Sequence, residues 1–382
     1  MRIGFLHLGD RRHGVSRYGR LLAGELDRRP DVEVVEQEPA QEGRTVKDRK
    51  ALIRAARALS CCDVVHVQYN RTLWGPGRSQ LGALRRFTAH CRAPLVASLH
   101  DVYLDDPWER WRHRSRSPWR RLRRRYRAHR QRTVIQKAVR LLHRHCRRVL
   151  VCFEQERSRL RPFRLDQRVR VVGHFVEERP ALPDRLESRR LLGLDSRRVA
   201  TVLGFIHPRK GYDLVVDALE LLPEDVLVVF AGTASEGNER ALRRWEKKAE
   251  KRGQGHRLKV TGYLEDELQA RWLVATDLGI CPFRFFSASG SLATWCSVGK
   301  PVLCHDLPQI EEYRAISPDS FFTFEDYTPE SFANAVTAAL ERVDGRPDPA
   351  MLILRDHFSI ARTADRHLAL YREVLEENRS SP

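Results

Sequence analysis

The sequence predicts an α/β protein with two doubly wound parallel sheets, one in each of two domains. Short apolar runs alternate with segments of helical spacing along the whole chain. Most of these runs are apolar at nearly every position, which is expected when helices cover both faces of a parallel sheet. The chain has 382 residues, enough for two domains of roughly 150–200 residues, each with its own core.

Strands and helices follow from the same pattern, taken in chain order. We expect strands at residues 2–9, 32–37, 64–69, 95–100, 148–153 and 169–173, and then at 199–206, 226–232, 258–264, 278–282, 301–306 and 321–324. We expect helices at residues 15–26, 46–59, 212–222, 241–252, 268–275, 329–343 and 360–377. The pattern lapses between residues 176 and 194, where the chain is polar and is interrupted by Pro180 and Pro183. The predicted domains are therefore 1–178 and 190–355.

The chain is strongly basic, with a net charge of +19. Part of this charge is concentrated between Arg110 and Arg148, where Trp111, Trp119 and Tyr126 are interleaved with arginines. Such a segment suits an anionic membrane surface, an acidic acceptor or, less well, a nucleic acid. The plainer interpretation is one or two long amphipathic helices with a solvated face.

Other features of the composition indicate a cytoplasmic protein. No run of about 18 apolar residues is present, so no transmembrane helix is expected. The apolar run at residues 3–8 is too short for a signal peptide. The eight cysteines are scattered without CxxC spacing, which indicates free thiols in a reducing compartment and predicts no metal site.

One segment carries a specific chemical signal. A predicted strand ending at Cys281 is followed by Pro282, a turn of small residues at 287–291, and a predicted helix. Backbone amides at the start of a helix are unpaired and lie at the positive end of the helix dipole. The amides of Ser289, Gly290 and Ser291 therefore suit a phosphate group.

Further polar or glycine-containing motifs follow predicted strands, at the edge where doubly wound folds bind ligands. They are His13-Gly14 with Tyr18 after the first strand, Ser98-Leu99-His100-Asp101-Val102 at the fourth, Gly204-Phe205-Ile206-His207-Pro208-Arg209-Lys210-Gly211 at the seventh, Ala231-Gly232-Thr233 at the eighth, and Thr261-Gly262-Tyr263-Leu264 at the ninth.

Together these motifs, with Pro282-Phe283-Arg284 and Gly299-Lys300-Pro301-Val302, resemble glycosyltransferase family four, also called glycosyl transferases group 1. The resemblance covers the whole chain and implies the GT-B fold, in which two Rossmann-like domains face each other across a cleft. It also implies that the last helix crosses back, so that residues 360–382 complete the first domain.

The resemblance implies a retaining, metal-independent, hexosyltransferase-like enzyme that moves a sugar from a nucleoside diphosphate sugar to a hydroxyl acceptor. The nucleotide sugar is then a co-substrate, and no cofactor is expected. The catalytic residues implied are His100, which contacts the donor sugar, and Lys210 with Arg209, which bind the diphosphate. The donor-binding residues implied are Gly14, Gly204, Gly232, Thr233, Tyr263, Leu264, Arg284, Ser289, Gly290, Ser291 and Thr294, and the acceptor-binding residues are His13, Tyr18 and Asp101.

The sequence departs from the family pattern at several of these positions. Phe286 and Thr294 occupy the places of two glutamates, the second of which usually holds the nucleotide ribose. Only Gly14 matches the usual pair of glycines, and Phe205 stands where many relatives have arginine.

The departures leave two alternatives open. One is a nucleotide-sugar epimerase of the same fold that uses Asp101 and His100, and the other is a non-catalytic scaffold that binds an anionic partner through Arg110 to Arg148. Neither the base of the donor nor the acceptor follows from the sequence, and a peripheral position at the inner membrane face stays open.

Overall fold

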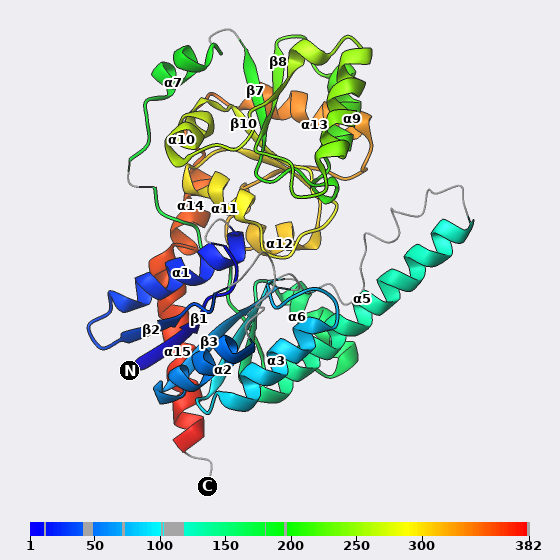
Figure 1. The fold of residues 1–382 in the computed structure, drawn as a ribbon. Coiled ribbons are helices and arrows are strands. Elements are labelled where there is room, and N and C mark those ends of the chain that lie inside the picture. The colour runs from blue at the N-terminus through cyan, green and yellow to red at the C-terminus, as the bar shows by residue number, and fades with distance from the viewer. Residues whose placement is uncertain are drawn as a thin grey trace. The chain divides into compact units, whose positions relative to one another are not determined.

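The structure, a computed structural model, describes all residues except 11–12, 41–48, 71–72, 101, 103–117, 180, 195–196 and 380–382. The chain divides into two compact units. Unit 1 contains Met1–His174 together with Ile360–Pro382, and unit 2 contains Phe175–Ser359. Each unit has a six-stranded sheet in which every pair of neighbouring strands is parallel (Figure 1).

In unit 1 the strand order is β2-β1-β3-β4-β5-β6. The strands are β1 (Arg2–Leu6), β2 (Glu33–Gln37), β3 (Val64–Tyr69), β4 (Leu95–Leu99), β5 (Cys146–Val151) and β6 (Val169–Val171). The helices are α1 (Gly14–Asp27), α2 (Arg49–Ala58), α3 (Ser79–His90), α5 (Pro118–His145), α6 (Glu154–Leu160) and α15 (Ile360–Arg379), with short 3-10 turns at Leu59–Cys61 and Arg161–Phe163. The chain changes direction across the sheet between β1 and β3, so ligands are expected at the carboxyl ends of these strands and of their neighbour β4.

In unit 2 the strand order is β12-β11-β10-β7-β8-β9. The strands are β7 (Arg198–Leu203), β8 (Val226–Ala231), β9 (Leu258–Val260), β10 (Leu278–Cys281), β11 (Val302–His305) and β12 (Phe322–Phe324). The helices are α7 (Arg185–Leu192), α8 (Tyr212–Ala218), α9 (Glu239–Lys251), α10 (Asp266–Ala275), α11 (Gly290–Ser297), α12 (Pro308–Arg314), α13 (Pro329–Arg342) and α14 (Pro349–His357), with 3-10 turns at Pro208–Lys210, Leu219–Leu221 and Gly255–Arg257. Here the change of direction falls between β7 and β10.

The α/β prediction with two doubly wound sheets is confirmed, and each predicted strand is present. Several strands end earlier than expected. The strand predicted at 199–206 ends at Leu203 because Gly204 has a φ of +100°, which takes the backbone out of the extended conformation. Helices α3, α6, α7, α12 and α14 were not predicted. Four of them, α6, α7, α12 and α14, have 7 to 9 residues, too short for a periodic pattern to be distinct.

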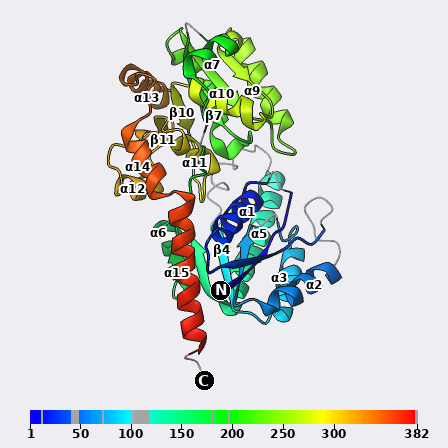
Figure 2. The ribbon, with the colours of Figure 1, turned by 90° about the vertical axis from the view of Figure 1, so that its left-hand side faces the viewer.

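The last helix, α15, belongs to unit 1 (Figure 2). Its apolar face, including Ile360, Ala364, Leu368 and Val374, is buried. Asp365 pairs with Arg29 of the segment after α1, with 2.8 Å between Nη2 and Oδ1, and Glu377 pairs with Arg148 of β5. This is the helix that was predicted at 360–377, and it completes unit 1.

Helix α5 contains most of the basic segment. Its C-terminal half packs into the core of unit 1 through buried residues such as Val134, Ala138 and Leu142. Its N-terminal half extends away from the sheet (Figure 1). There Trp119, Leu122 and Tyr126 are 79%, 59% and 60% exposed. Across the described ranges, no helix is both long and apolar enough to cross a membrane.

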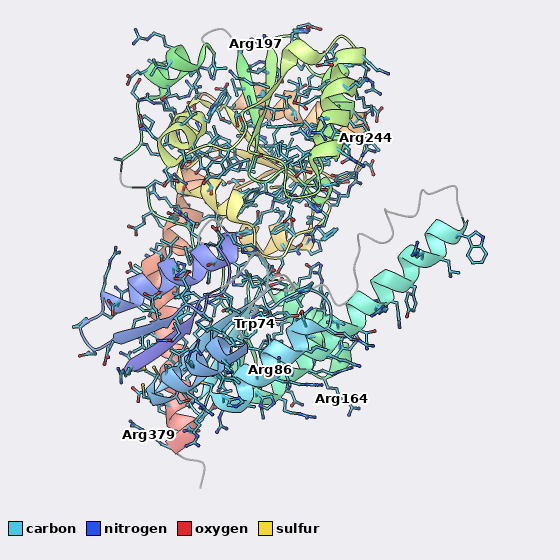
Figure 3. All side chains as sticks on the ribbon, viewed as in Figure 1. Trp74, Arg86, Arg164, Arg197, Arg244 and Arg379 are labelled. Atoms are coloured by element: carbon cyan, nitrogen blue, oxygen red, sulfur yellow. The ribbon has the colours of Figure 1, made fainter. Side chains whose placement is uncertain are left out.

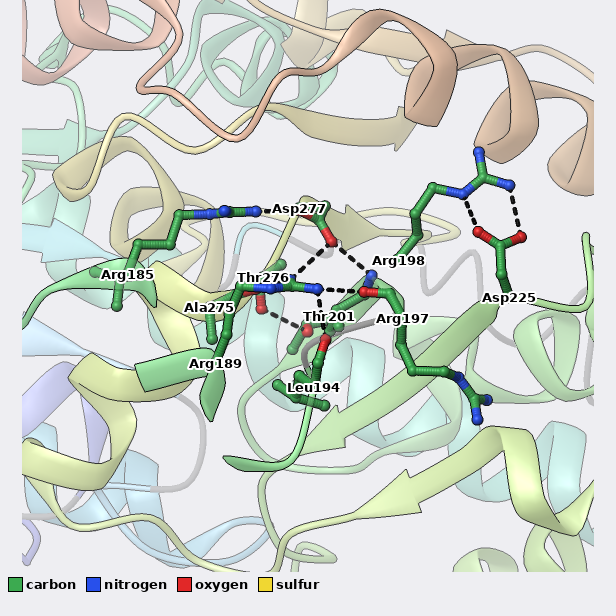
Figure 4. Close-up of polar contacts among 12 residues, drawn as sticks. Arg185, Arg189, Leu194, Arg197, Arg198, Thr201, Asp225, Ala275, Thr276 and Asp277 are labelled. Atoms are coloured by element: carbon green, nitrogen blue, oxygen red, sulfur yellow. Dashed lines mark hydrogen bonds and ion pairs between the residues drawn. The ribbon is translucent and has the colours of Figure 1, made fainter. Parts of the chain in front are cut away.

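A buried ion-pair network holds α7 against the start of the sheet in unit 2 (Figure 4). Arg189 donates from Nη1 to Asp277 at 3.1 Å and to the Ala275 carbonyl at 2.8 Å. The Asp277 carboxylate also accepts from the Val199 amide at 2.7 Å. Asp277 also accepts from Arg185 at 2.5 Å, so the almost fully buried Arg189 depends on Asp277 for a counter-charge, whereas Asp277 has two cationic partners.

Candidate functional site

The segments after β7 and β10 meet at the edge of the unit 2 sheet where its direction changes. Lys210, in the 3-10 turn after β7, places Nζ 2.9 Å from Oγ of Ser291 in the first turn of α11. The Ser291 hydroxyl donates to the carbonyl oxygen of Leu203 at 2.9 Å, and Lys210 Nζ lies 3.5 Å from the same oxygen. Two segments 81 residues apart in sequence are thus joined by one cation.

The environment of Lys210 favours an anionic ligand. The pKa of its ammonium is lowered to about 8, mainly by burial, with smaller effects from Cys281, which raises it, and Arg209, which lowers it. Its hydrogen bonds in the described residues go to neutral oxygens, so no carboxylate compensates the charge there. An anion beside Nζ would compensate it.

Gly204 makes room for this lysine. A Cβ atom on Gly204 would lie 2.9 Å from both Lys210 Nζ and Ser291 Oγ, and the φ of +100° would also strain any other residue. Gly204, the first residue of the predicted motif, is therefore required because the side chains of Lys210 and Ser291 approach its backbone closely. Phe205, next to it, is 46% exposed.

The N-terminus of α11 lies beside the lysine. Ser289 is the N-cap residue, and its Oγ accepts a hydrogen bond from the amide of Leu292 at 3.3 Å. Gly290 and Ser291 are the first two residues of the helix, and Gly290 is exposed. Helix geometry leaves their amides without intrahelical acceptors. A cation and the positive end of a helix dipole therefore converge on one place, an arrangement that suits a phosphate.

Arg284 is placed differently from Lys210. Its guanidinium donates to Asp213 of α8 at 2.7 Å and lies over the ring of Tyr327 at 4.2 Å. Tyr327 in turn donates to the Pro282 carbonyl at 2.7 Å. These contacts stabilise the loop between β10 and α11, and the charge of Arg284 is already paired with Asp213.

The two residues that replace the family's glutamates have distinct environments. Phe286 is 6% exposed, its ring centroid lies 5.9 Å from that of Phe283, and its carbonyl accepts from Gln309 at 2.8 Å. A carboxylate would be buried at this position. Thr294 is half-buried, and its hydroxyl donates to the Gly290 carbonyl of the preceding turn at 2.8 Å.

The remaining donor-site candidates lie after β8 and β9. The Gly232 amide donates to Oγ1 of Thr261 at 3.1 Å, and the Thr233 carbonyl accepts from Ile206 at 2.8 Å. Tyr263 is 50% exposed, whereas Leu264 is buried. Arg209, in the turn after β7, accepts through its carbonyl from the Arg284 amide at 3.5 Å.

A second group of candidate residues lies in unit 1. His100 directly follows β4 and is 5% exposed, and Tyr18 of α1 packs its ring edge against it, with 4.9 Å between centroids. His13 is the N-cap of α1 and accepts from the Val15 amide at 3.3 Å, and Gly14 begins the helix. Asp101, the third predicted acceptor residue, lies outside the described residues.

Several polar residues around His100 were not recognised from the sequence. His174 lies 4.9 Å from Tyr18 between ring centroids, and Gln68 and His66 of β3 connect His100 to α15. The sequence feature that could have indicated them is the presence of His66 and Gln68 at alternate positions in an otherwise apolar strand. In the described part of the chain, no three His, Cys, Asp or Glu side chains form a metal-ligand group.

Comparison with known proteins agrees with this geometry. Residues 196–342, which include Lys210 and the α11 turn, match the family model "Glycosyl transferases group 1". The chain resembles the group 1 glycosyltransferases. Over 202 residues it is 30% identical to glycogen synthase of Anaeromyxobacter sp. (strain Fw109-5), a match that covers 49% of this chain and 40% of that protein. The chain thus matches less than half the length of this curated relative.

Solved structures show the same fold along the whole chain. Sucrose-phosphate synthase from Thermosynechococcus elongatus gives a TM-score of 0.75 at 16% identity, covering 99% of this chain and 100% of that one. HepE from Anabaena, in complex with UDP and glucose, gives 0.72 at 16% identity, covering 98% and 100%. At such identities the likeness concerns the fold, the two Rossmann-like domains of the GT-B glycosyltransferases.

Proposed function

We propose that this chain is a glycosyltransferase that transfers a sugar from a nucleoside diphosphate sugar to a hydroxyl acceptor. The observation that carries the proposal is the contact between Lys210 and Ser291 at the N-terminus of α11, within the segment that matches group 1 glycosyltransferases. Structures of HepE with UDP and with UDP-glucose make a uridine nucleotide the first donor to test.

Stabilisation of the leaving group would be the main catalytic contribution of unit 2. As the bond between the anomeric carbon and the diphosphate oxygen breaks, negative charge grows on that oxygen. Lys210, together with the amides of Gly290 and Ser291, would stabilise this charge, and Arg209 would add a second cation. The acceptor oxygen forms the new bond to the anomeric carbon, and its proton passes to the departing phosphate.

His100 would orient the sugar rather than exchange protons. Burial, with smaller effects from His174, His13 and His367, lowers its pKa to about 3, so the ring is neutral at physiological pH. We further propose that the reaction retains the anomeric configuration, uses a hexose donor and needs no metal. Identifying the anomer of the product by NMR, and assaying with and without EDTA, would test these points.

Nucleotide binding tests the donor site directly. We would measure the thermal stability of wild type and Lys210→Ala with UDP, GDP, ADP and dTDP. A ligand at about 100 times its dissociation constant adds roughly 2.7 kcal/mol to the free energy of unfolding. Lys259→Ala is the control, because Lys259 of β9 is a lysine of the same unit that lies over the Trp272 ring and is not part of the Lys210–Ser291 contact. A rise for one nucleotide in wild type and the control, but not in Lys210→Ala, supports the proposal; no rise with any nucleotide would favour the non-catalytic alternative.

Epimerization remains a separable outcome of the same experiments. If the donor sugar is converted to its epimer without an acceptor, and no sugar is transferred to any hydroxyl, the enzyme is an epimerase rather than a transferase. Product analysis by NMR after incubation with the nucleotide sugar alone distinguishes the two reactions.

We also propose that the N-terminal half of α5 contacts an anionic membrane surface, which would place a cytoplasmic enzyme at the inner membrane face. Residues 118–132 include eight arginines and no Asp or Glu. Trp119, Leu122 and Tyr126 are spaced by three and four residues, so they share one side of the helix, and all are exposed. Exposed aromatic and aliphatic side chains among arginines are typical of helices that bind at the lipid interface.

Flotation with vesicles tests this contact. Arg123→Gln/Arg130→Gln should bind vesicles of anionic phospholipid more weakly than wild type, and salt should weaken the binding of both proteins. Arg243→Gln/Arg244→Gln on α9 of unit 2 is the matched control, because both arginines are also exposed. Equal binding to neutral and anionic vesicles, or equal loss in both variants, would argue against α5 as the contact.

A further inference from the structure

A continuous line of buried polar side chains crosses unit 1 from β4 to the last helix. His100 Nε2 lies 2.6 Å from Gln68 Oε1, and the Gln68 amide nitrogen lies 3.4 Å from His66 Nε2. His66 Nδ1 lies 2.5 Å from the hydroxyl of Tyr371 on α15. Each of the four residues is at most 5% exposed. Buried polar networks of this kind hold one arrangement when every member has a partner.

The chemistry of the groups gives these bonds a direction. An amide oxygen only accepts, so the proton between His100 and Gln68 belongs to His100 Nε2. The Gln68 amide nitrogen only donates, so His66 Nε2 is the acceptor, and it also accepts from the Ser98 hydroxyl at 2.8 Å. A neutral His66 then carries its proton on Nδ1 and donates it to Tyr371. Burial lowers the pKa of His66 well below its usual value, which keeps it neutral.

We infer that Gln68 is a positioning residue that holds His100 in the tautomer with a proton on Nε2, and that His66 and Tyr371 of α15 fix the orientation of Gln68. The role of His100 in the reaction rests on the proposed function, whereas its tautomer follows from the contacts of Gln68 alone. Because Nε2 keeps the proton, Nδ1 of His100 is the acceptor nitrogen. In this tautomer Nδ1 can accept a hydrogen bond from a sugar hydroxyl. In the other tautomer Nδ1 would carry the proton and could not accept one.

Gln68 is also held from its other sides. Its backbone carbonyl accepts from the indole nitrogen of Trp74 at 2.9 Å; Trp74 is labelled within unit 1 in Figure 3. Helix α1 packs directly over its side chain at Gly19, where a Cβ would lie 3.1 Å from Gln68 Cγ. On the far side, His367 of α15 stacks on His66 at 5.5 Å and is held through Nδ1 by the Thr363 carbonyl at 2.8 Å. Rotation of the Gln68 amide would break its bonds to both histidines.

Side-chain NMR of protein labelled with ¹⁵N in histidine tests the inference without any substrate. A protonated ring nitrogen and an unprotonated one resonate far apart, so the spectrum reports the tautomer of each histidine. His100→Asn identifies the signals of His100. We expect wild type to show His100 with Nε2 protonated and Gln68→Met to show a mixture of tautomers or the Nδ1-protonated form. Tyr371→Phe should shift the signals of His66, because the variant lacks the hydroxyl that Nδ1 contacts.

Gln80→Met is the matched control. Gln80 is 3% exposed and accepts from Tyr69 at 2.8 Å, so this substitution also removes a buried glutamine of unit 1, but one outside the histidine network. Its His100 signals should match those of wild type. An unchanged His100 tautomer in Gln68→Met, or the same change in Gln80→Met, would overturn the inference.

Kinetics then connect the tautomer to the reaction. Gln68→Met should lower kcat by about tenfold, the effect of one hydrogen bond, with a smaller change in KM for the donor. Gln68→Asn keeps both amide groups on a shorter side chain and should recover part of the loss. If the tautomer changes but no transferase activity exists in wild type, the proposed function fails while the positioning role stands. If wild type is active and kcat is unchanged in Gln68→Met, the positioning role is wrong.

Discussion

Lys210 Nζ and Ser291 Oγ lie 2.9 Å apart and connect the loop after β7 to the first turn of α11. Neither residue alone defines a site, because lysines and serines are common at helix starts. Their contact places a partly desolvated cation beside a helix N-terminus, at the position in the unit 2 sheet where the strand order reverses. This convergence of charge and amides makes the place suitable for a diphosphate.

Nucleotide affinity should depend on the charge of Lys210. Because burial lowers its pKa to about 8, the free protein loses this charge as the pH rises above 8, whereas a bound diphosphate would raise the pKa. We therefore expect the dissociation constant to increase by up to about tenfold per pH unit above pH 8. Calorimetric titration between pH 7 and 9.5 measures this, and Lys210→Arg, which stays charged, should show a flatter profile. A flat profile in wild type would contradict a role for the ammonium.

Phe286 and Thr294 should differ sharply in their tolerance of the family's glutamate. Phe286→Glu buries a carboxylate and should lower the free energy of unfolding by several kcal/mol. Thr294→Glu places the charge on a half-buried helix position and should change stability by less than about 1 kcal/mol. Urea denaturation measures both. Phe286→Leu, which keeps the position apolar, separates the cost of the charge from the cost of altered packing.

The buried histidines of unit 1 should make the protein sensitive to acid. Burial lowers the pKa of His100 to about 3 and that of His367 to about 4, whereas in the unfolded chain each would be near 6.5. The unfolded state therefore binds more protons below pH 6.5, and stability should fall as the pH decreases toward 4. Each group contributes up to about 1.4 kcal/mol per pH unit. His367→Gln should reduce this slope in urea denaturation series at several pH values, and an unchanged slope would argue against His367.

Two of the ion pairs drawn in Figure 4, Arg189–Asp277 and Arg198–Asp225, should differ in energetic importance. Asp277→Ala leaves the Arg189 guanidinium buried without a counter-charge and should cost about 3–5 kcal/mol. Asp225→Ala removes the partner of the more exposed Arg198 and should cost less than about 1 kcal/mol. Equilibrium unfolding in urea compares them. Similar costs for the two variants would show that the α7 network is less buried in solution than in the structure.

The architecture was predictable because strands of a covered parallel sheet must be apolar on both faces. The runs at 64–69 and 226–232 show this pattern and became β3 and β8. The ends of the elements were less predictable, because they depend on single backbone conformations. A glycine such as Gly204 can adopt a positive or a negative φ, so the sequence does not predict where the backbone leaves the extended conformation.

The amino-acid sequence by itself determined the fold class, because apolar runs of strand length have a local physical meaning. It also predicted the turn at 287–291 and Lys210 as candidates for binding a diphosphate. Tertiary structure alone decided what these residues contact. Arg284 and Asp213 are paired although 71 residues separate them, and His66 contacts Tyr371 across 305 residues at the end of the line from His100 through Gln68. The burial of Phe286 likewise arises from packing. No local pattern records such contacts, since they arise only when separate strands and helices pack into one core.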